Sequence, residues 1–510
     1  MKFASAIAAA AVLVIPFVGA TNSTKPRNYI YFLPDGYGPA SETFARDYAN
    51  YKNNDTNKLP VDNYAIGYVR TYASDTLVTD SAAAATAYGC GIKTYNGAIG
   101  VDPSFAPHGN IVEAAKLAGF HTGLVSTSRI THASPAGFST HVFDRDSEAA
   151  IADQLVGYAH PLGRVVDIMM GGGRCFFLPQ SDEDSCRDDD VDLWSLAQTD
   201  YNWTMTSGRE KFDELSNGLE GGEIPFAFIP NLSHMMYEVD RESSLEPSLE
   251  EMAITTLNWL DRLSKDSDKG FFLFIEAARI DHAGHSHDPI GHLHDILEYN
   301  RAMEAVIQWI ATDHTDTALL SGADHECGGL TMGVPDYAWY PEVLEPGSGS
   351  AEHFVSVYED WEESFPNATQ DAKNTYVATQ IFEPYGIFNA TGSEVTGFYN
   401  ASDPAVYMGN LLAARAGINW STLGHTAVDI TLFGYGINTD SLIGNWNNVE
   451  VGHFMASQLG LNLSIATEKL QANESFVGGI LADASASSST KKLRKRLLAD
   501  HESVHLGHKH

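Results

Sequence analysis

Short apolar runs alternate with longer amphipathic segments along most of this 510-residue chain, and this alternation restricts the possible folds more than any other feature. Between the runs, residues 247–265 and 292–310 repeat apolar side chains at helical spacing. The runs have the length and composition of strands and cover residues 29–33, 119–126, 164–169, 271–275, 319–321 and 430–433. The alternation predicts an α/β fold with a large, mostly parallel central sheet and helices on both faces.

Two segments depart from this pattern. Residues from about 330 to 420 are rich in Gly, Pro, aromatic residues and N-glycosylation sequons. They predict an irregular, crown-like subdomain that is inserted into one catalytic domain spanning 21–481. The segment 482–510 is rich in Ser and Ala, then basic and His-rich, and it has no apolar period that could pack. We therefore expect a disordered tail there.

The N-terminus predicts a secretory signal peptide over residues 1–20, because Lys2 precedes an apolar stretch that ends in small residues at Ala20. An uncleaved membrane anchor is the alternative, but the apolar run is short and Pro16 interrupts it. No later stretch stays apolar for about 18 residues, and the C-terminus has no hydrophobic tail. We expect a secreted or luminal protein without a membrane anchor.

Sequons and cysteines agree with this route. Cys175 and Cys186 bracket a short polar loop and are the best disulfide pair in an oxidising compartment, whereas Cys90 and Cys327 have the surroundings of buried free thiols. The candidate glycosylation sites are Asn22, Asn54, Asn202, Asn231, Asn367, Asn389, Asn400, Asn419, Asn462 and Asn473. A glycosylated extracellular protein is the simplest interpretation.

The charge balance excludes two classes of protein. The chain has 31 Lys and Arg against 66 Asp and Glu, a formal net charge of −35, and 44% of its residues are hydrophobic. A disordered chain would combine high charge with low hydrophobicity, so this one is expected to fold. Nucleic acid is excluded as a bound scaffold, because its phosphates need clustered Lys and Arg.

Metal-type side chains follow several of the predicted strands, and in an open α/β sheet ligands bind beyond the carboxyl ends of the strands. Carboxylates mixed with imidazoles suit Zn²⁺, whereas carboxylates with a hydroxyl suit Mg²⁺. One Asp–His pair at a strand end is more often a cap or a hydrogen-bonding group. Caps do not explain the whole group, which comprises Asp35, Glu276, Asp281, His285, Asp324, His325 and His425.

Ser81 is the candidate nucleophile. It lies in the segment VTDSAAAAT, whose small residues favour a helix that starts just behind it. The unpaired N–H groups and positive dipole end of a helix N-terminus suit an anionic phosphate. An Asp or Ser that only caps a buried Ala-rich helix would give the same segment, so both interpretations stay open at this point.

Several separated motifs resemble those of the alkaline phosphatase family. VTDSAAAAT is similar to the family's nucleophile segment, and FIEAARIDHAGH and GADHECGG are similar to its metal motifs. Together with THASPAGFSTHVFDR and LGHT, they run in the family's order between residues 30 and 435. The resemblance implies a secreted phosphomonoesterase that forms a phosphoserine intermediate on Ser81 and acts on small phosphate monoesters as a homodimer.

The resemblance also implies which residues do the chemistry. Two zinc ions and one magnesium ion would be bound, by Asp281, His285 and His425 (first zinc), by Asp35, Asp324 and His325 (second zinc), and by Asp35, Ser134 and Glu276 (magnesium). Arg145, which ends the motif THASPAGFSTHVFDR, would bind the phosphate. Asp80, His132 and His282 would lie just outside the metal ligands.

The sequence departs from the family pattern at three positions. His132 and His282 stand where bacterial members carry Asp and Lys, which leaves the identity of the third ion open. Cys327 stands where many members carry His, and we expect it beside the second zinc. A phosphodiesterase of the same superfamily is the alternative function, but its nucleophile is usually Thr and it lacks the motif that ends in Arg145.

Overall fold

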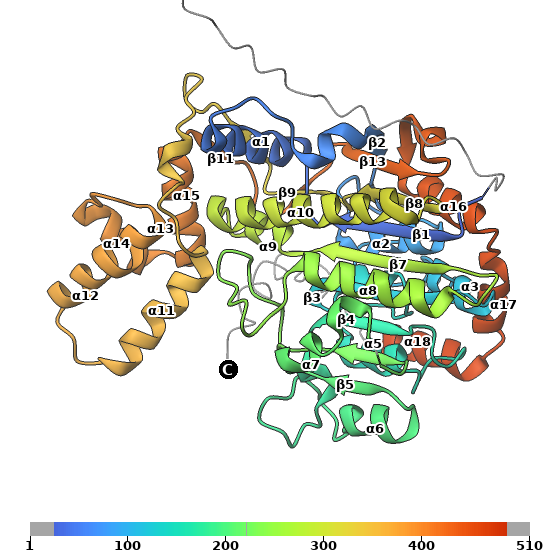
Figure 1. Ribbon diagram of the computed structural model, residues 1–510. Helices are drawn as coiled ribbons and strands as arrows, with labels where there is room; N and C mark the ends of the chain where they lie inside the picture. Colours follow the sequence, from blue (N-terminus) through green and yellow to red (C-terminus); the bar gives the residue numbers. More distant parts are fainter. Residues whose placement is uncertain (1–24, 221, 487–510) are drawn as a thin grey trace, which may run out of the picture.

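The computed structural model describes residues 25–220 and 222–486 (Figure 1). The signal peptide expected at 1–20, the sequon at Asn22 and residues 487–510 of the expected tail lie outside the described residues. The central element is a ten-stranded sheet with the strand order β14-β2-β13-β8-β1-β7-β3-β4-β6-β5. An α/β class built on a large sheet is therefore confirmed.

The sheet is mostly parallel. Within the ten-stranded sheet, among the described residues, only β13 runs antiparallel to its neighbours, β2 and β8. The strands are β1 (Asn28–Pro34), β2 (Ala65–Arg70), β3 (His121–Arg129), β4 (Ile168–Gly172), β5 (Thr204–Thr206), β6 (Phe226–Phe228), β7 (Phe271–Ala277), β8 (Thr317–Gly322), β13 (Ile430–Gly436) and β14 (Gly444–Asn447). Two small antiparallel pairs join β9 (Glu326–Cys327) to β12 (His425–Thr426) and β10 (Leu330–Met332) to β11 (Ile418–Trp420).

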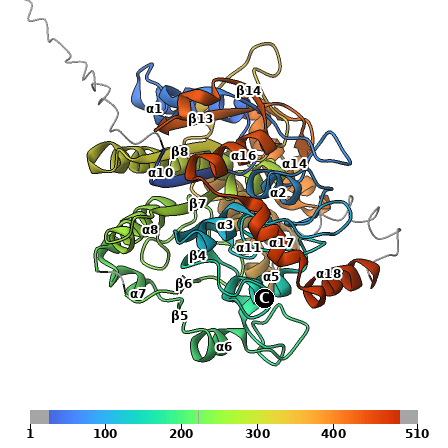
Figure 2. The same ribbon diagram turned by 90° about the vertical axis from the view of Figure 1, so that its right-hand side faces the viewer.

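Helices cover both faces of the sheet, as the view along its edge shows (Figure 2). One face carries α8 (Leu249–Ser264) and α10 (Pro289–Asp313), with α1 (Pro39–Asn53) packed on α10. The other face carries α2 (Ser81–Cys90), α3 (Ile111–Leu117), α16 (Asn448–Leu459) and α17 (Leu463–Gln471), with α4 (Ala133–Gly137) packed on α2. The remaining helices of the body are α5 (Glu148–Val156), α6 (Leu193–Asp200), α7 (Arg209–Asp213), α9 (Arg279–His285), α18 (Glu474–Ala486), η1 (Pro60–Tyr64), η2 (Arg174–Phe177), η3 (Ser216–Gly218) and η6 (Thr439–Leu442).

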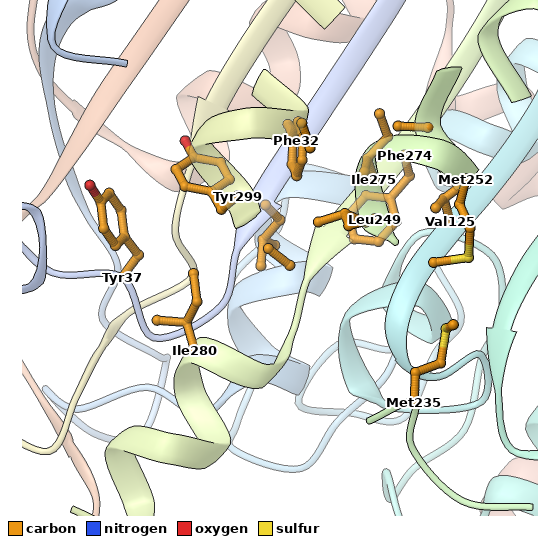
Figure 3. Packing of buried hydrophobic residues seen from close by; sticks show 14 of the residues in the cluster. Phe32, Tyr37, Val125, Met235, Leu249, Met252, Phe274, Ile275, Ile280 and Tyr299 are labelled. Atoms are coloured by element: carbon orange, nitrogen blue, oxygen red, sulfur yellow. The ribbon is translucent and has the colours of Figure 1, made fainter. Parts of the chain in front are cut away.

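The core lies between the sheet and these helices. All seven residues of β1 and of β7 are buried, as expected for parallel strands that are covered on both faces. Figure 3 shows Val125 of β3 and Phe274 and Ile275 of β7 beside Leu249 and Met252 of α8. This packing makes the strands a rigid support for the side chains that follow their carboxyl ends.

One predicted strand is wrong in position. Residues 164–169 were expected to be extended, but β4 begins only at Ile168. Arg164 and Asp167 form an ion pair three residues apart, and Arg164 also donates to the carbonyl of Val166. Residues 164–166 have no regular secondary structure, and these local polar contacts, which hydrophobicity alone does not predict, hold them outside the strand.

The insertion is largely helical rather than irregular. Its helices are η4 (Pro341–Val343), α11 (Ala351–Ser364), α12 (Gln370–Tyr376), the π-helix η5 (Val377–Phe382), α13 (Glu383–Tyr385), α14 (Gly392–Asn400) and α15 (Pro404–Ala416). Ser350, Thr369, Thr391 and Asp403 cap the starts of four of them with their side chains. At the base, β10 and β11 pair Leu330 with Trp420. Figure 1 shows these helices projecting away from the sheet, and we call them the crown subdomain.

The structure also bears on the predictions for the C-terminal tail, the membrane anchor and the cysteines. The boundary expected at 482 falls inside α18, which continues to Ala486 and packs Phe476 and Ile480 against Ala98 and Val101. No helix among the described residues is long and apolar enough to cross a membrane. The disulfide Cys175–Cys186 is confirmed, and Cys90 and Cys327 are buried free thiols as expected.

Candidate active site

Three adjacent parallel strands bring the candidate ligands together. β1 lies between β7 and β8, so Asp35, Glu276 and Asp324 meet at one edge of the sheet. The backbone N–H of Asp35 continues the ladder by donating to Ala277 O at 3.1 Å. Gly36 follows at a φ of +74°, and a Cβ there would lie 2.6 Å from the Cα of Asp281. Only glycine fits this close approach of the β1 turn to α9.

The first group consists of Asp281, His285 and His425. Asp281 and His285 stand one helical turn apart on α9, and Asp281 Oδ2 lies 3.2 Å from His285 Nε2. The two Nε2 atoms of His285 and His425 are 3.1 Å apart. Each Nδ1 faces a backbone carbonyl, of Leu423 at 2.5 Å and of Thr79 at 2.8 Å, so each Nδ1 donates and leaves an Nε2 lone pair. Two facing lone pairs beside a carboxylate are stable together when a cation lies between them.

The second group consists of Asp35, Asp324 and His325, and all three are buried. His325 Nε2 lies 2.9 Å from Asp324 Oδ2 and 3.8 Å from Asp35 Oδ1. Neither oxygen of Asp35 accepts a hydrogen bond within the described residues. Burial, with the charges of Asp324 and Asp281, raises the pKa of Asp35 well above its usual range. Buried carboxylates without donors are costly, and a divalent cation would satisfy them.

A third set of oxygens lies beside Asp35. Glu276 Oε2 accepts hydrogen bonds from Ser126 and, at 3.1 Å, from Ser128, while its Oε1 accepts none within the described residues. Ser134 Oγ, at the start of α4, also has no hydrogen-bond partner among them. Burial raises the pKa of Glu276 to about 7. An all-oxygen donor set of this kind suits a hard cation such as Mg²⁺.

Ser81 is the first residue of α2, and Asp80 is its N-cap. Asp80 Oδ1 accepts from Ala83 N at 2.9 Å, so the capping role that the sequence left open is real. It does not exclude the other role, because the buried Ser81 Oγ lies 3.1 Å from His325 Nε2 in the second group. The serine hydroxyl therefore sits at once on a helix N-terminus and beside the candidate metal ligands.

Arg145 lies next to this serine through Asp80. Its Nη1 is 3.2 Å from Asp80 Oδ2, and its Nη2 is 3.1 Å from His132 Nε2. Its backbone N–H donates to Gly97 O at 2.8 Å, while the N–H of Gly97 donates to Asp80 Oδ2 at 2.9 Å. This small network fixes a planar, permanently charged fork beside the nucleophile.

His132 and His282 belong to a cluster that contains a residue the sequence did not predict. His234 completes it, with ring centroids 5.3 Å from His132 and 4.3 Å from His282. Burial and neighbouring arginines lower the pKa of all three imidazoles, that of His282 to about 3. The rings of His132, His234 and His282 contact, in that order, Arg145, Arg129 and Arg279. A cation is therefore less favoured here than in the two groups that contain carboxylates.

The expected position of Cys327 is wrong. Its sulfur lies with Asp281, His285 and His425 in the first group, not with the second. The reason is the strand pair β9–β12, which places Cys327 directly opposite His425. Burial raises the pKa of this thiol.

A mostly parallel sheet with carboxylates, imidazoles and a serine at its carboxyl edge defines a metal-dependent hydrolase of the α/β class. Comparison with known proteins makes this specific. The family model described as alkaline phosphatase matches residues 26–461. The chain belongs to the alkaline phosphatase family, so it is a phosphomonoesterase and its activity depends on metal ions.

Individual relatives agree. An alkaline phosphatase of Schizosaccharomyces pombe is 39% identical over 459 residues, which cover 88% of this chain and 84% of the relative. The repressible alkaline phosphatase of Saccharomyces cerevisiae is 40% identical over 484 residues, with the same coverage. Among solved structures, the alkaline phosphatase of Thermus thermophilus has a TM-score of 0.73 and 26% identity over 88% of this chain and 96% of that chain. The diesterase alternative is not favoured.

Proposed function

We propose that this phosphomonoesterase uses Ser81 as its nucleophile and binds two zinc ions and one magnesium ion at the three groups described above. The ligands would be Asp281, His285 and His425 for the first zinc, Asp35, Asp324 and His325 for the second, and Asp35, Ser134 and Glu276 for magnesium. The observation that carries the proposal is the 3.1 Å contact between Ser81 Oγ and His325 Nε2, because it joins the serine to a ligand group.

Bound zinc would act as a Lewis acid that lowers the pKa of a hydroxyl or of water and stabilises a leaving alkoxide. Ser81 Oγ attacks phosphorus in line, the Oγ–P bond forms and the ester oxygen leaves with the bonding electrons. The N-terminus of α2 and the guanidinium of Arg145 hold the phosphoryl oxygens as charge moves between them. Water then cleaves the phosphoserine, and two inversions retain the configuration at phosphorus.

The neighbouring side chains keep this arrangement in place. Asp80 orients Arg145 and caps α2 with the same carboxylate, so it couples the phosphate-binding group to the nucleophile. His132 accepts a hydrogen bond from Arg145 and thereby limits its rotation. His282 is held by Arg279 at 2.8 Å. We assign these residues to positioning rather than to direct contact with metal.

The test compares wild type with Ser81→Ala on p-nitrophenyl phosphate and on bis(p-nitrophenyl) phosphate, each with and without a chelator. Wild type should prefer the monoester and lose activity with chelator. The variant should lose at least about a thousandfold in kcat while keeping its metal content in mass spectrometry. Preference for the diester, or activity that survives chelation, would contradict the proposal.

We further propose secretion after removal of residues 1–20, with glycans on the exposed sequons. Asn231 is the exception among the described sequons, because its amide nitrogen already donates to Glu246 at 2.6 Å and to His234 O at 3.1 Å. Glycopeptide mass spectrometry of secreted protein should find Asn231 unmodified.

Family resemblance also suggests a homodimer, and light scattering on the purified protein would show a monomer if that is wrong.

A further inference from the structure

The sequon at Asn367 lies in the loop that joins α11 to α12 in the crown subdomain, whose helices are labelled in Figure 1. The segment reads Phe-Pro-Asn-Ala-Thr over 365–369. The N–H of Ala368 donates to Phe365 O at 3.0 Å and closes a four-residue turn. Asn367 and Phe365 are both exposed and lie within this one turn, two residues apart.

Phe365 begins a row of aromatic rings. The residue is 56% exposed, so most of its ring surface is open to a ligand. Its ring centroid lies 5.7 Å from that of Trp361, which in turn stacks on Tyr376 at 4.2 Å and 12°. The row runs from the sequon along the surface between α11 and α12.

The row leads into an open hollow of about 500 Å³, which Trp361 and Tyr376 line together with polar side chains. Asp371, Thr375 and Thr379 repeat every fourth residue along one helical face, a length on the order of 12 Å. Aromatic faces beside hydroxyl and carboxylate groups are the chemistry that binds a saccharide, since its C–H face stacks on a ring while its hydroxyls find hydrogen bonds.

We propose that the N-linked glycan of Asn367 rests on the Phe365 ring and continues into this hollow, so that the crown subdomain has a carbohydrate-binding surface occupied by the chain's own glycan. Attachment in the turn that contains Phe365 favours this occupant over a free saccharide, because a tethered ligand has a high effective concentration. The exposed Phe365 thereby gains a partner. The inference rests on the glycosylation proposed above and is independent of the catalytic residues.

The experiment uses the full chain secreted from a eukaryotic host. Glycopeptide mass spectrometry measures the occupancy of Asn367, and hydrogen exchange follows the backbone of 365–380 before and after enzymatic deglycosylation. We expect Asn367 to be occupied. Removal of its glycan should speed exchange in this segment by about two- to tenfold, the range that one aromatic stacking contact supports.

Three variants make the test specific. Asn367→Gln should reproduce the faster exchange, and Phe365→Ala should reproduce it with the glycan still attached. The sequon is removed at Asn367 because Thr369 also caps α12 through Ala372 N at 3.3 Å. Asn419→Gln removes an exposed sequon on β11 and should leave exchange in 365–380 unchanged.

Several results would overturn the proposal. An unmodified Asn367 would do so, as would exchange that is the same with and without the glycan. Equal protection from hydrogen exchange in Phe365→Ala and wild type would show that the Phe365 ring does not hold the glycan. Protection of the Asn367→Gln variant by an added high-mannose oligosaccharide at micromolar concentration would show that the surface takes free saccharides instead.

Discussion

A fully buried charged group that is separate from the proposed metal ligands consists of Glu113, His141 and His160. Glu113 Oε1 lies 2.8 Å from His141 Nε2 and 2.9 Å from His160 Nε2. The Nδ1 of His141 is 2.8 Å from Gly100 O. Both ring nitrogens of His141 thus face acceptors and both must donate, so this ring is an imidazolium paired with a buried carboxylate.

The contribution of the Glu113–histidine ion pairing to the free energy of unfolding follows from the pKa of Glu113. Burial alone would raise it, but His141 and His160 hold it at about 2, against 4.5 for an unperturbed Glu. The difference corresponds to roughly 3 kcal/mol of stability. Because the folded pKa is depressed, that stability is present above pH 4.5 and is lost as the pH falls from 4.5 toward 2.

Replacing Glu113 by Gln at pH 7 should therefore cost about 3–5 kcal/mol, because it leaves the His141 charge buried without a counter-ion. Urea unfolding of the metal-loaded protein measures the loss. The matched control is Glu214→Gln, which breaks the solvent-exposed pair between Glu214 and Lys211 and should cost at most about 1 kcal/mol. A double variant with His141→Gln should recover part of the loss, since it removes the stranded charge.

Two results would refute this reasoning. If Glu113→Gln unfolds within about 1 kcal/mol of wild type, His141 is neutral in the folded protein and no ion pair exists. If the double variant is no more stable than Glu113→Gln, the loss comes from packing rather than from charge.

Three further predictions concern the site and the disulfide. Arg145→Ala should raise the inhibition constant of inorganic phosphate by about ten- to a hundredfold, and an unchanged constant would remove Arg145 from phosphate binding. His325→Ala should reduce bound zinc by about one ion per chain in metal analysis, and full zinc content would separate His325 from the second group. Cys175→Ser opens a loop with a sequence separation of 11 residues and should cost about 3 kcal/mol, whereas identical thermal unfolding would show that the bridge adds nothing.

Much of the site could be predicted because its residues follow strands. Asp35, Glu276 and Asp324 come directly after apolar runs, and a parallel sheet brings such positions to one edge. His234 could not be predicted, because it lies in a loop after β6 and no strand end or motif marks it. The inserted crown subdomain was predicted, but its helices were not. The many aromatic residues and glycines of this segment make its helical period hard to recognise. The clearest sequence signals of its helices are N-cap residues such as Ser350 and Thr369.

Strand β12 carries His425, the last of the proposed ligands in the sequence. It pairs with β9, and the entire crown subdomain lies between these two strands in the sequence. Asp281 and His285 are synthesised long before His425, so the growing chain holds an incomplete group until the crown subdomain has been made. Pairing of β12 with β9, which places His425 opposite Cys327, brings the last member into the group. The order of the residues in the sequence therefore determines when the proposed first ligand group can be complete. A chain that stops before 425 lacks one of the proposed ligands and the β9–β12 pairing that positions it.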